Sequence, residues 1–255
     1  MIMEYAIVGY GKMGKLYDQL LHCQYLIDQF PVNNRVYFSS IEEFIDYKPN
    51  VDLVIVCSSS NAHYYISRLL LLNNYNVLVE KPISLSSLET IELEKIARKK
   101  RLILYQSTLE RYNPLIKFFK NTLNFNNIDW IESYRIGICP NRFYIEDAKF
   151  DLGIHDVDLF FYLVKKRIKW IAHARFGKPR REIIVHLKNQ TIIYFDLLNK
   201  QVRFPDEIID FKSIINNPIL EMIKDINKQG CSINEKWSDE IAKIESSSDD
   251  PIILD

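Results

Sequence analysis

The chain has 255 residues, 47% of them hydrophobic and 26% charged, and its 33 basic residues balance its 33 acidic ones. This composition is typical of a globular protein with one large or two smaller domains. Neither sign of charge forms a long block, which argues against nucleic-acid binding or a polybasic membrane anchor as the main function. The expected partner is therefore a small molecule.

The cysteines and the N-terminus indicate a cytoplasmic protein. Cys23, Cys57, Cys139 and Cys231 lie far apart, match no zinc spacing and are too few for a disulfide framework. The first residues lack a basic leader, and no apolar stretch approaches the ~20 residues of a membrane span. We expect reduced thiols, no metal and no membrane association.

The first predicted strand, residues 5–8, runs directly into the glycine cluster GYGKMG. A G-x-G-x-x-G pattern between a strand and a helix is typical of dinucleotide binding. Its first glycine makes a tight turn, its second admits the pyrophosphate, and its third lets helix and strand pack closely. The helix N-terminus then offers free N–H groups to the phosphates. The predicted cofactor contacts here are Gly9, Gly11, Lys12, Met13 and Gly14.

After the glycines, strand-like and helix-like runs alternate, as a parallel sheet with crossover helices requires. A helix over 15–23 precedes a strand at 24–30, which carries Asp28 at the position where such folds keep an acid for the ribose hydroxyls. An acid there repels a 2′-phosphate, so NAD is favoured over NADP, although Arg35 could serve a 2′-phosphate. The next connection is too short for a helix. Further strands are predicted at 36–38, 51–57 and 76–79, and helices at 40–47 and 62–74.

Beyond about residue 107 the runs become longer and richer in β-branched and aromatic residues. Strands at 129–138, 169–177, 182–188 and 191–198 predict a mostly antiparallel sheet, with helices near 151–165 and 217–230. The predicted domains are 1–107, a dinucleotide-binding domain, 108–245, a shortened α/β domain with an open sheet, and 246–255, a flexible tail.

Two motifs supply candidate catalytic groups. Lys81, in Glu80-Lys81-Pro82, follows a strand at the carboxyl edge of the sheet, where open α/β folds bind ligands. Asp151 and His155 are four residues apart, so both lie on one helix face, and an acid beside an imidazole suits proton transfer. The plainer alternatives are a surface turn for Lys81 and a capping acid beside an ordinary histidine. In the second of these alternatives, Asp156 and Asp158 also favour the helix start.

In their order and spacing, GYGKMG, VEKPIS and DLGIHDVD resemble the Gfo/Idh/MocA family of NAD(P)-dependent oxidoreductases. Residues 58–63, SSSNAH, are similar to its Thr-Pro-Asn-x-x-His loop, and residues 110–114, ERYNP, to its Arg-Phe-x-Pro segment. The chain departs from the family at Ser60, where proline is common, and at 148–150, where a glycine pair is replaced. These departures indicate an altered substrate pocket.

The resemblance implies a Rossmann domain, an α/β domain with an open sheet, and a site between them. His155 would act as the base, Lys81 would bind or relay the proton of the same oxygen, and Asp151 would orient a hydroxyl or the imidazole. Further cofactor contacts would come from Ser58, Ser59, Asn61, His63, Glu80 and Lys81. Substrate contacts would come from Arg111, Tyr112, Arg142 and Lys149, the last two for a phosphate or carboxylate.

The implied reaction is hydride transfer between nicotinamide and a secondary alcohol or ketone of a sugar, sugar acid or nucleotide sugar, in a dimer or tetramer formed through the open sheet face. The alternative is a non-catalytic NAD(P)-binding regulator, which needs the glycine loop but not the proton-transfer groups. A biliverdin-reductase-like activity fits less well, because the D-x-x-x-H pair is present. Asn61 also fits a helix cap, His63 a surface residue, and Arg142 and Lys149 solvated charges.

Overall fold

The computed structural model divides the chain into two compact units. The first contains Met1–Ser107 and Met222–Ile241, and the second contains Thr108–Glu221 and Ala242–Asp255. The structure describes residues 3–32, 35–137, 149–163, 168–174, 178–229, 236–247 and 252–254.

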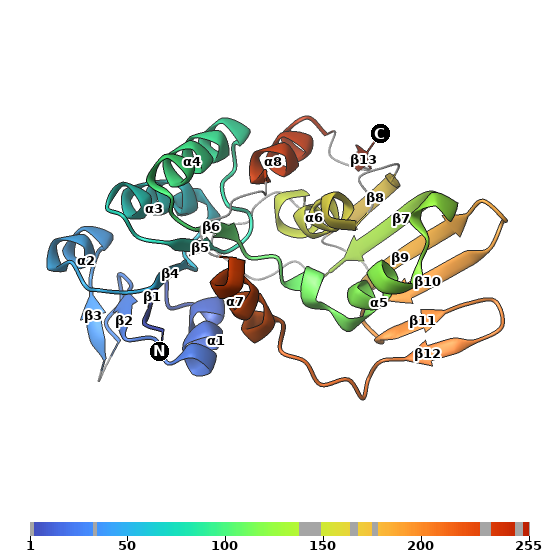
Figure 1. Ribbon diagram of the computed structural model, residues 1–255, viewed down its shortest axis with the longest axis horizontal. Helices are drawn as coiled ribbons and strands as arrows, with labels where there is room; N and C mark the ends of the chain where they lie inside the picture. Colours follow the sequence, from blue (N-terminus) through green and yellow to red (C-terminus); the bar gives the residue numbers. More distant parts are fainter. Residues whose placement is uncertain are drawn as a thin grey trace. The chain divides into compact units, whose positions relative to one another are not determined.

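The first unit is built on a six-stranded parallel sheet in the order β3-β2-β1-β4-β5-β6 (Figure 1). Its strands are β1 (Tyr5–Val8), β2 (Tyr25–Ile27), β3 (Val36–Phe38), β4 (Leu53–Val56), β5 (Val77–Val79) and β6 (Leu104–Gln106). All residues of β1, β4 and β5 are buried, as parallel strands covered on both faces should be. The strand order reverses between β1 and β4, which in open α/β sheets marks the ligand-binding edge.

Four helices connect these strands: α1 (Lys12–Leu21), α2 (Ile41–Tyr47), α3 (Ser60–Leu72) and α4 (Ser87–Lys100). The connection from β2 to β3 has no helix in its described residues, as the sequence predicts. Arg35 at its end forms an ion pair of 2.9 Å with Asp18 on α1. Burial favours a higher pKa for Asp18, but Arg35 and the Tyr10 hydroxyl outweigh it and lower that pKa. This contact ties the short connection to α1.

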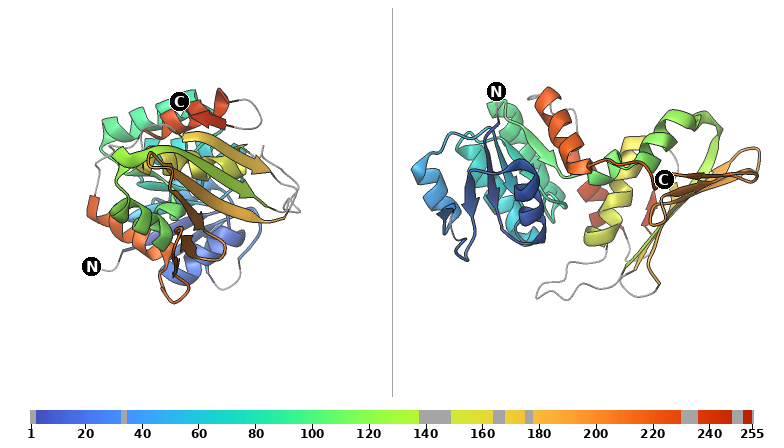
Figure 2. Two further views of the ribbon diagram at one scale, coloured as in Figure 1. Left: turned by 90° about the vertical axis from the view of Figure 1, so that its right-hand side faces the viewer. Right: turned by 90° about the horizontal axis from the view of Figure 1, so that it is seen from below.

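The second unit contains a seven-stranded sheet in the order β12-β11-β10-β9-β7-β8-β13. Its strands are β7 (Ile128–Ile136), β8 (Ile168–Ala174), β9 (Arg180–Leu187), β10 (Ile192–Asp196), β11 (Gln201–Arg203), β12 (Ile208–Asp210) and β13 (Ile252–Leu254). Helices α5 (Pro114–Thr122) and α6 (Ile154–Leu163) lie on one face of it (Figure 2). The predicted mostly antiparallel sheet is confirmed. Among the described strands of this second sheet, only β7 and β8 pair in parallel, because α6 lies in the connection between them.

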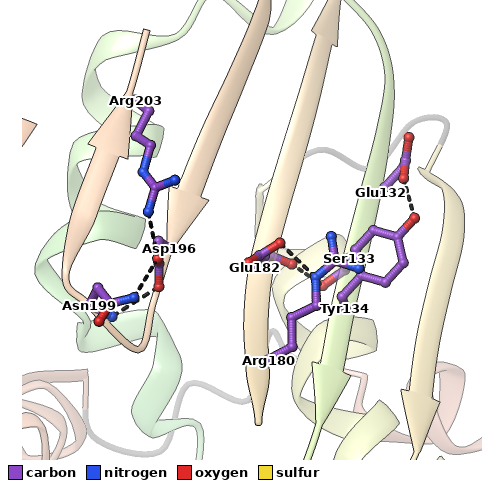
Figure 3. Close-up of polar contacts among 8 residues, drawn as sticks. All are labelled: Glu132, Ser133, Tyr134, Arg180, Glu182, Asp196, Asn199 and Arg203. Atoms are coloured by element: carbon purple, nitrogen blue, oxygen red, sulfur yellow. Dashed lines mark hydrogen bonds and ion pairs between the residues drawn. The ribbon is translucent and has the colours of Figure 1, made fainter. Parts of the chain in front are cut away.

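Polar contacts order the second sheet at two places (Figure 3). At the turn from β10 to β11, Asp196 accepts hydrogen bonds from Asn199 and pairs with Arg203 at 3.1 Å. Across β7 and β9, the Arg180 guanidinium lies 3.7 Å from the ring centre of Tyr134 and bonds Glu182 at 2.7 Å.

Two C-terminal helices, α7 (Pro218–Gln229) and α8 (Trp237–Glu245), each contain residues of both units. Residues 222–241 thus depart from the expected continuous domain at 108–245, because apolar side chains such as Met222 and Trp237 are fully buried in the first unit. The expected flexible tail is also corrected, since Ile252–Leu254 pairs with β8 as an edge strand. The apolar sequence Ile252–Leu254 favours a strand, although the residues before it are polar.

Candidate nucleotide and catalytic sites

The three glycines of the loop after β1 meet different surroundings. Gly9 has φ +93°, and a Cβ there would lie 2.7 Å from the backbone of Cys57. A Cβ on Gly14 would lie 2.1 Å from the Gly9 carbonyl oxygen, whereas one on Gly11 would meet nothing within 4 Å. Gly9 and Gly14 are therefore needed for the fold, and Gly11 leaves open space.

That open space belongs to a cavity of about 520 Å³ in the first unit, at the carboxyl ends of β1, β2 and β4 and the start of α2. Five predicted cofactor residues line it, and so do several that sequence reasoning missed. Among the missed residues are Ser39 and Ser40. Their place directly after the predicted strand at 36–38, at the carboxyl edge of the sheet, was the signal that could have identified them. The lining residues are Val8, Gly9, Gly11, Ile27, Asp28, Gln29, Ser39, Ser40, Ile41, Cys57, Ser58, Ser59 and Ile66.

Asp28 is fixed at the edge of this cavity by two backbone groups. The Tyr10 N–H donates to one carboxylate oxygen at 2.6 Å and the Phe30 N–H to the other at 2.9 Å. An ionised carboxylate has about four acceptor positions, so two bonds leave acceptors for ribose hydroxyls. Arg35 points elsewhere: its guanidinium donates to both oxygens of Asp18 at 2.9 and 3.0 Å. The structure thus gives no support for a 2′-phosphate contact by Arg35.

The loop after β4 carries an unsatisfied polar atom. The Ser58 Oγ is buried and has no hydrogen-bond partner among the described residues, which is rare for buried side chains. Together with Gly11 and Asp28, it makes this cavity fit a nucleotide cofactor. Asn61 is exposed and is not the cap of α3, because Ser59 occupies that position. His63 is not a surface residue, since it is 1% exposed.

The turn after β5 carries Glu80 and Lys81. The Glu80 carboxylate accepts a hydrogen bond of 3.0 Å from Tyr17, whose hydroxyl also lies 3.1 Å from the Ser107 Oγ. Tyr17 is fully buried, and this burial, reinforced by the Glu80 charge, raises its pKa well above the usual value. Lys81 itself is half-buried. The turn is therefore anchored to α1 and to the end of β6.

Asp151 and His155 lie in the second unit, in one continuous helical segment. Residues Lys149–Gly153 form a π-helical turn, which continues as α6 from Ile154. The helix predicted near 151–165 therefore begins with a π-helical turn and becomes α-helical only from Ile154. Both candidate side chains are half-buried, as is Lys149. Arg142 lies outside the described residues.

Two buried ion pairs attach α6 to the rest of the second unit. Asp156 bonds Arg135 of β7 at 2.9 Å, and Asp158 bonds Arg111 at 2.6 Å. Asp156 lies in the first turn of α6, as the plainer alternative has it, but both carboxylates are buried against arginines. Arg135 also donates to Glu110 at 2.9 Å. Burial favours a higher pKa for Glu110, but the Arg135 charge outweighs it and lowers that pKa.

Arg111 and Tyr112, predicted to contact substrate, are 5% and 7% exposed. The Arg111 guanidinium lies 4.8 Å from the ring centre of Tyr162 as well as on Asp158. These contacts give Arg111 a structural role in the second unit, and its substrate contact stays a prediction. Arg135 was missed, although the strand alternation places it on the same face as the buried Ile131 and Ser133.

Within the described ranges, no helix is long and apolar enough to cross a membrane. The same residues contain no group of three or more His, Cys, Asp or Glu side chains that could hold a metal ion.

Comparison with known proteins agrees with this geometry. Residues 3–108 match the model of an oxidoreductase family with an NAD-binding Rossmann fold. The chain is 26% identical to UDP-N-acetylglucosamine 3-dehydrogenase of Acidithiobacillus ferrooxidans over 113 residues, 44% of this chain and 36% of that protein. It is 27% identical to myo-inositol 2-dehydrogenase of Thermotoga maritima over 128 residues, 48% of this chain and 38% of that protein. The matches thus span well under half of these two relatives.

Solved structures match the whole fold at lower identity. The UDP-N-acetylglucosamine 3-dehydrogenase structure from Acidithiobacillus ferrooxidans gives a TM-score of 0.78 at 18% identity and covers 95% of each chain. The WlbA dehydrogenase from Bordetella pertussis, in complex with NADH and UDP-GlcNAcA, gives 0.76 at 14% identity and covers 100% of this chain and 99% of that one. At these identities the likeness shows the fold alone.

Proposed function

Since residues 3–108 belong to the Gfo/Idh/MocA family of NAD-binding oxidoreductases, we propose that this protein transfers a hydride between a nicotinamide dinucleotide and a secondary alcohol or ketone of a carbohydrate. The observation that carries the cofactor half is the cavity beside Gly11, edged by the Asp28 carboxylate. A cyclic polyol, sugar acid or nucleotide sugar is the proposed substrate class. Relatives named for myo-inositol and UDP-N-acetylglucosamine support that class.

NAD is the proposed cofactor, in preference to NADP. Asp28 brings a negative charge to the cavity edge, where it repels a 2′-phosphate, and Arg35 is engaged by Asp18. Gly9, Gly11, Lys12 and Met13 lie at the start of α1, where backbone N–H groups favour phosphates. When bound, the nicotinamide accepts or supplies the hydride.

The proposed proton chemistry uses Lys81, Asp151 and His155. His155 takes the proton of the substrate hydroxyl, because imidazole titrates near neutrality. The Lys81 ammonium stabilises negative charge on the same oxygen, and Asp151 orients the imidazole or a neighbouring hydroxyl. In the reverse direction, His155 returns the proton to the carbonyl oxygen as a ketone is reduced.

We also propose a cytoplasmic homo-oligomer. Cys23 and Cys57 are free thiols, which suits a reducing compartment. In the segment 191–198, which contains β10 of the open sheet, Tyr194 and Leu198 are 42% and 45% exposed, whereas Ile193 and Phe195 are buried. Only alternate side chains of that segment can therefore contact a partner. Light scattering coupled to size-exclusion chromatography measures the assembly.

The central test has two stages. Purified protein is first titrated with NADH and NADPH by fluorescence, and then given inositols, sugar acids and nucleotide sugars while nicotinamide absorbance is recorded. We expect tighter binding of NADH and turnover of at least one substrate. Tight NADH binding with no turnover across the panel would instead favour the regulatory alternative.

Variants then assign the roles. Lys81→Met and His155→Ala are each expected to abolish most turnover and leave NADH affinity nearly unchanged, because neither residue lines the cavity. Lys99→Met and His22→Ala are matched controls, since both side chains are exposed. Full activity in Lys81→Met or His155→Ala would contradict the assigned role.

A further inference from the structure

His63 connects two loops of the first unit through both nitrogens of its ring. It lies in the first turn of α3 and is almost fully buried. Its Nδ1 lies 2.7 Å from the Pro82 carbonyl oxygen, and its Nε2 lies 3.0 Å from the Ser58 carbonyl oxygen. One loop carries Lys81, and the other lines the nucleotide cavity.

These two carbonyl partners bear on the protonation state of the ring. A carbonyl oxygen only accepts hydrogen bonds, and a neutral imidazole has one N–H donor and one lone pair. Either neutral tautomer therefore leaves a ring lone pair facing a carbonyl lone pair at hydrogen-bond distance. The imidazolium donates at both nitrogens, and charged donors form stronger hydrogen bonds. The two contacts together favour the charged ring.

We propose that His63 is a positioning residue, which as an imidazolium holds the Lys81 turn and the Ser58 loop together. This inference rests on the proposed function, because that function gives the two loops their roles. Gln106 supports the same turn from another side: its Oε1 accepts from the Ile83 N–H at 2.9 Å. The turn is thereby held on both sides of Pro82.

Other ionisable groups on the flanking segments have contacts of their own. Glu92 on α4, which packs against α3, accepts from Arg68 at 2.7 Å, and Glu80 accepts from Tyr17 at 3.0 Å. Loss of the His63 proton leaves one carbonyl facing a lone pair and loosens one of the two loops. Within residues 57–68 and 80–92, the ionisable side chains besides His63 are Cys57, Tyr64, Tyr65, Arg68, Glu80, Lys81, Glu89 and Glu92.

The charge on the ring is measured directly in the wild-type protein without cofactor. Nitrogen-15 NMR of the imidazoles distinguishes a doubly protonated ring from either neutral tautomer, and single variants assign the five histidines. We expect both His63 nitrogens to remain protonated at pH 7. A neutral His63 ring at pH 7 would overturn the inference. If His63 variants fail to fold, variants of the other four histidines assign its signal by elimination.

The positioning role is measured by hydrogen–deuterium exchange. His63→Leu removes both donors and is expected to speed exchange selectively in segments 57–60 and 80–84. His63→Gln keeps one amide donor group and is expected to restore part of the protection. His22→Gln is the matched control, because that histidine is exposed at the end of α1. Equal exchange in the two segments for wild type and His63→Leu, or a uniform rise across the first unit, would refute the role.

NADH binding separates the two proposals. We expect His63→Leu to raise the Kd of NADH about tenfold, since a charge-assisted contact to the cavity loop is lost. If the wild type binds neither NADH nor NADPH, the proposed function fails, while ring protonation and exchange still decide the role of His63. If NADH binds and both loops are unaffected by His63→Leu, only this inference fails.

Discussion

Gly11→Ala separates the cofactor role of the glycine loop from its role in folding. Gly11 precedes α1 with φ −75° and ψ −156°, an extended conformation that alanine also adopts, and its Cβ would meet no atom within 4 Å. Reduced entropy of the unfolded chain favours alanine by about 0.4–1 kcal/mol. Alanine is a poorer helix N-cap than glycine, at a cost of roughly the same size. The free energy of unfolding should therefore change by less than about 1 kcal/mol.

The affinity for NADH should respond differently. Gly11 lines the cavity that we propose for the cofactor, so the added methyl group would crowd a pyrophosphate bound there, and overpacking of this kind costs about 1–3 kcal/mol. That cost corresponds to a rise in Kd of roughly 5-fold to 140-fold. Fluorescence titration measures the Kd, and urea unfolding without cofactor measures the stability.

Two further variants bracket this result. Gly14→Ala places a Cβ 2.1 Å from the Gly9 carbonyl oxygen, so it should lose both stability and binding. Gly137→Ala adds a Cβ that also meets nothing within 4 Å, but it lies in the second unit and should change neither. Wild-type affinity in Gly11→Ala, or a loss of stability as large as that of Gly14→Ala, would refute the reasoning.

Three other predictions concern single carboxylates and their partners. Asp28→Ala should weaken NAD binding, and an unchanged Kd would place the ribose contact elsewhere. Arg135→Met leaves Asp156 and Glu110 without their shared partner, so urea unfolding should show a loss of about 3–5 kcal/mol. Adding Asp156→Leu should recover part of that loss, because Glu110 stays unpaired. Glu110 has a lowered pKa in the folded state, so its stabilisation is complete above its ordinary pKa of 4.5 and is lost as the pH falls through the lower folded value. Unfolding measured below pH 4.5 should therefore show a smaller acid-induced loss in Glu110→Gln than in the wild type.

Local sequence patterns predicted the elements whose environment is uniform. The runs at β1, β4 and β5 are continuously apolar because helices cover both faces of the sheet, and that pattern needs no knowledge of distant contacts. The glycine loop was predictable from its own pattern between a strand and a helix. The contact of Gly14 with the Gly9 carbonyl lies within the loop, whereas the approach of Gly9 to the Cys57 backbone joins distant segments.

Contacts between distant segments were beyond such patterns. Asp156 and Asp158 look like helix-start acids in sequence, and only the approach of Arg135 and Arg111 turns them into buried ion pairs. The burial and hydrogen bonding of His63 likewise depend on the Pro82 carbonyl, nineteen residues away in the sequence. The parallel pairing of β7 and β8 had a usable signal, because a helix between two strands indicates a crossover.

The late return of the chain to the first unit has a consequence for its synthesis. The Glu94 carboxylate accepts from the backbone and side chain of Ser238, and Gln106 donates to Glu240. A nascent chain that has emerged only to residue 107 has made the nucleotide cavity's lining but lacks these partners and the buried Trp237. We therefore expect the first unit to stay incompletely folded on the ribosome until residues 237–241 are translated, and a fragment ending at residue 107 to aggregate.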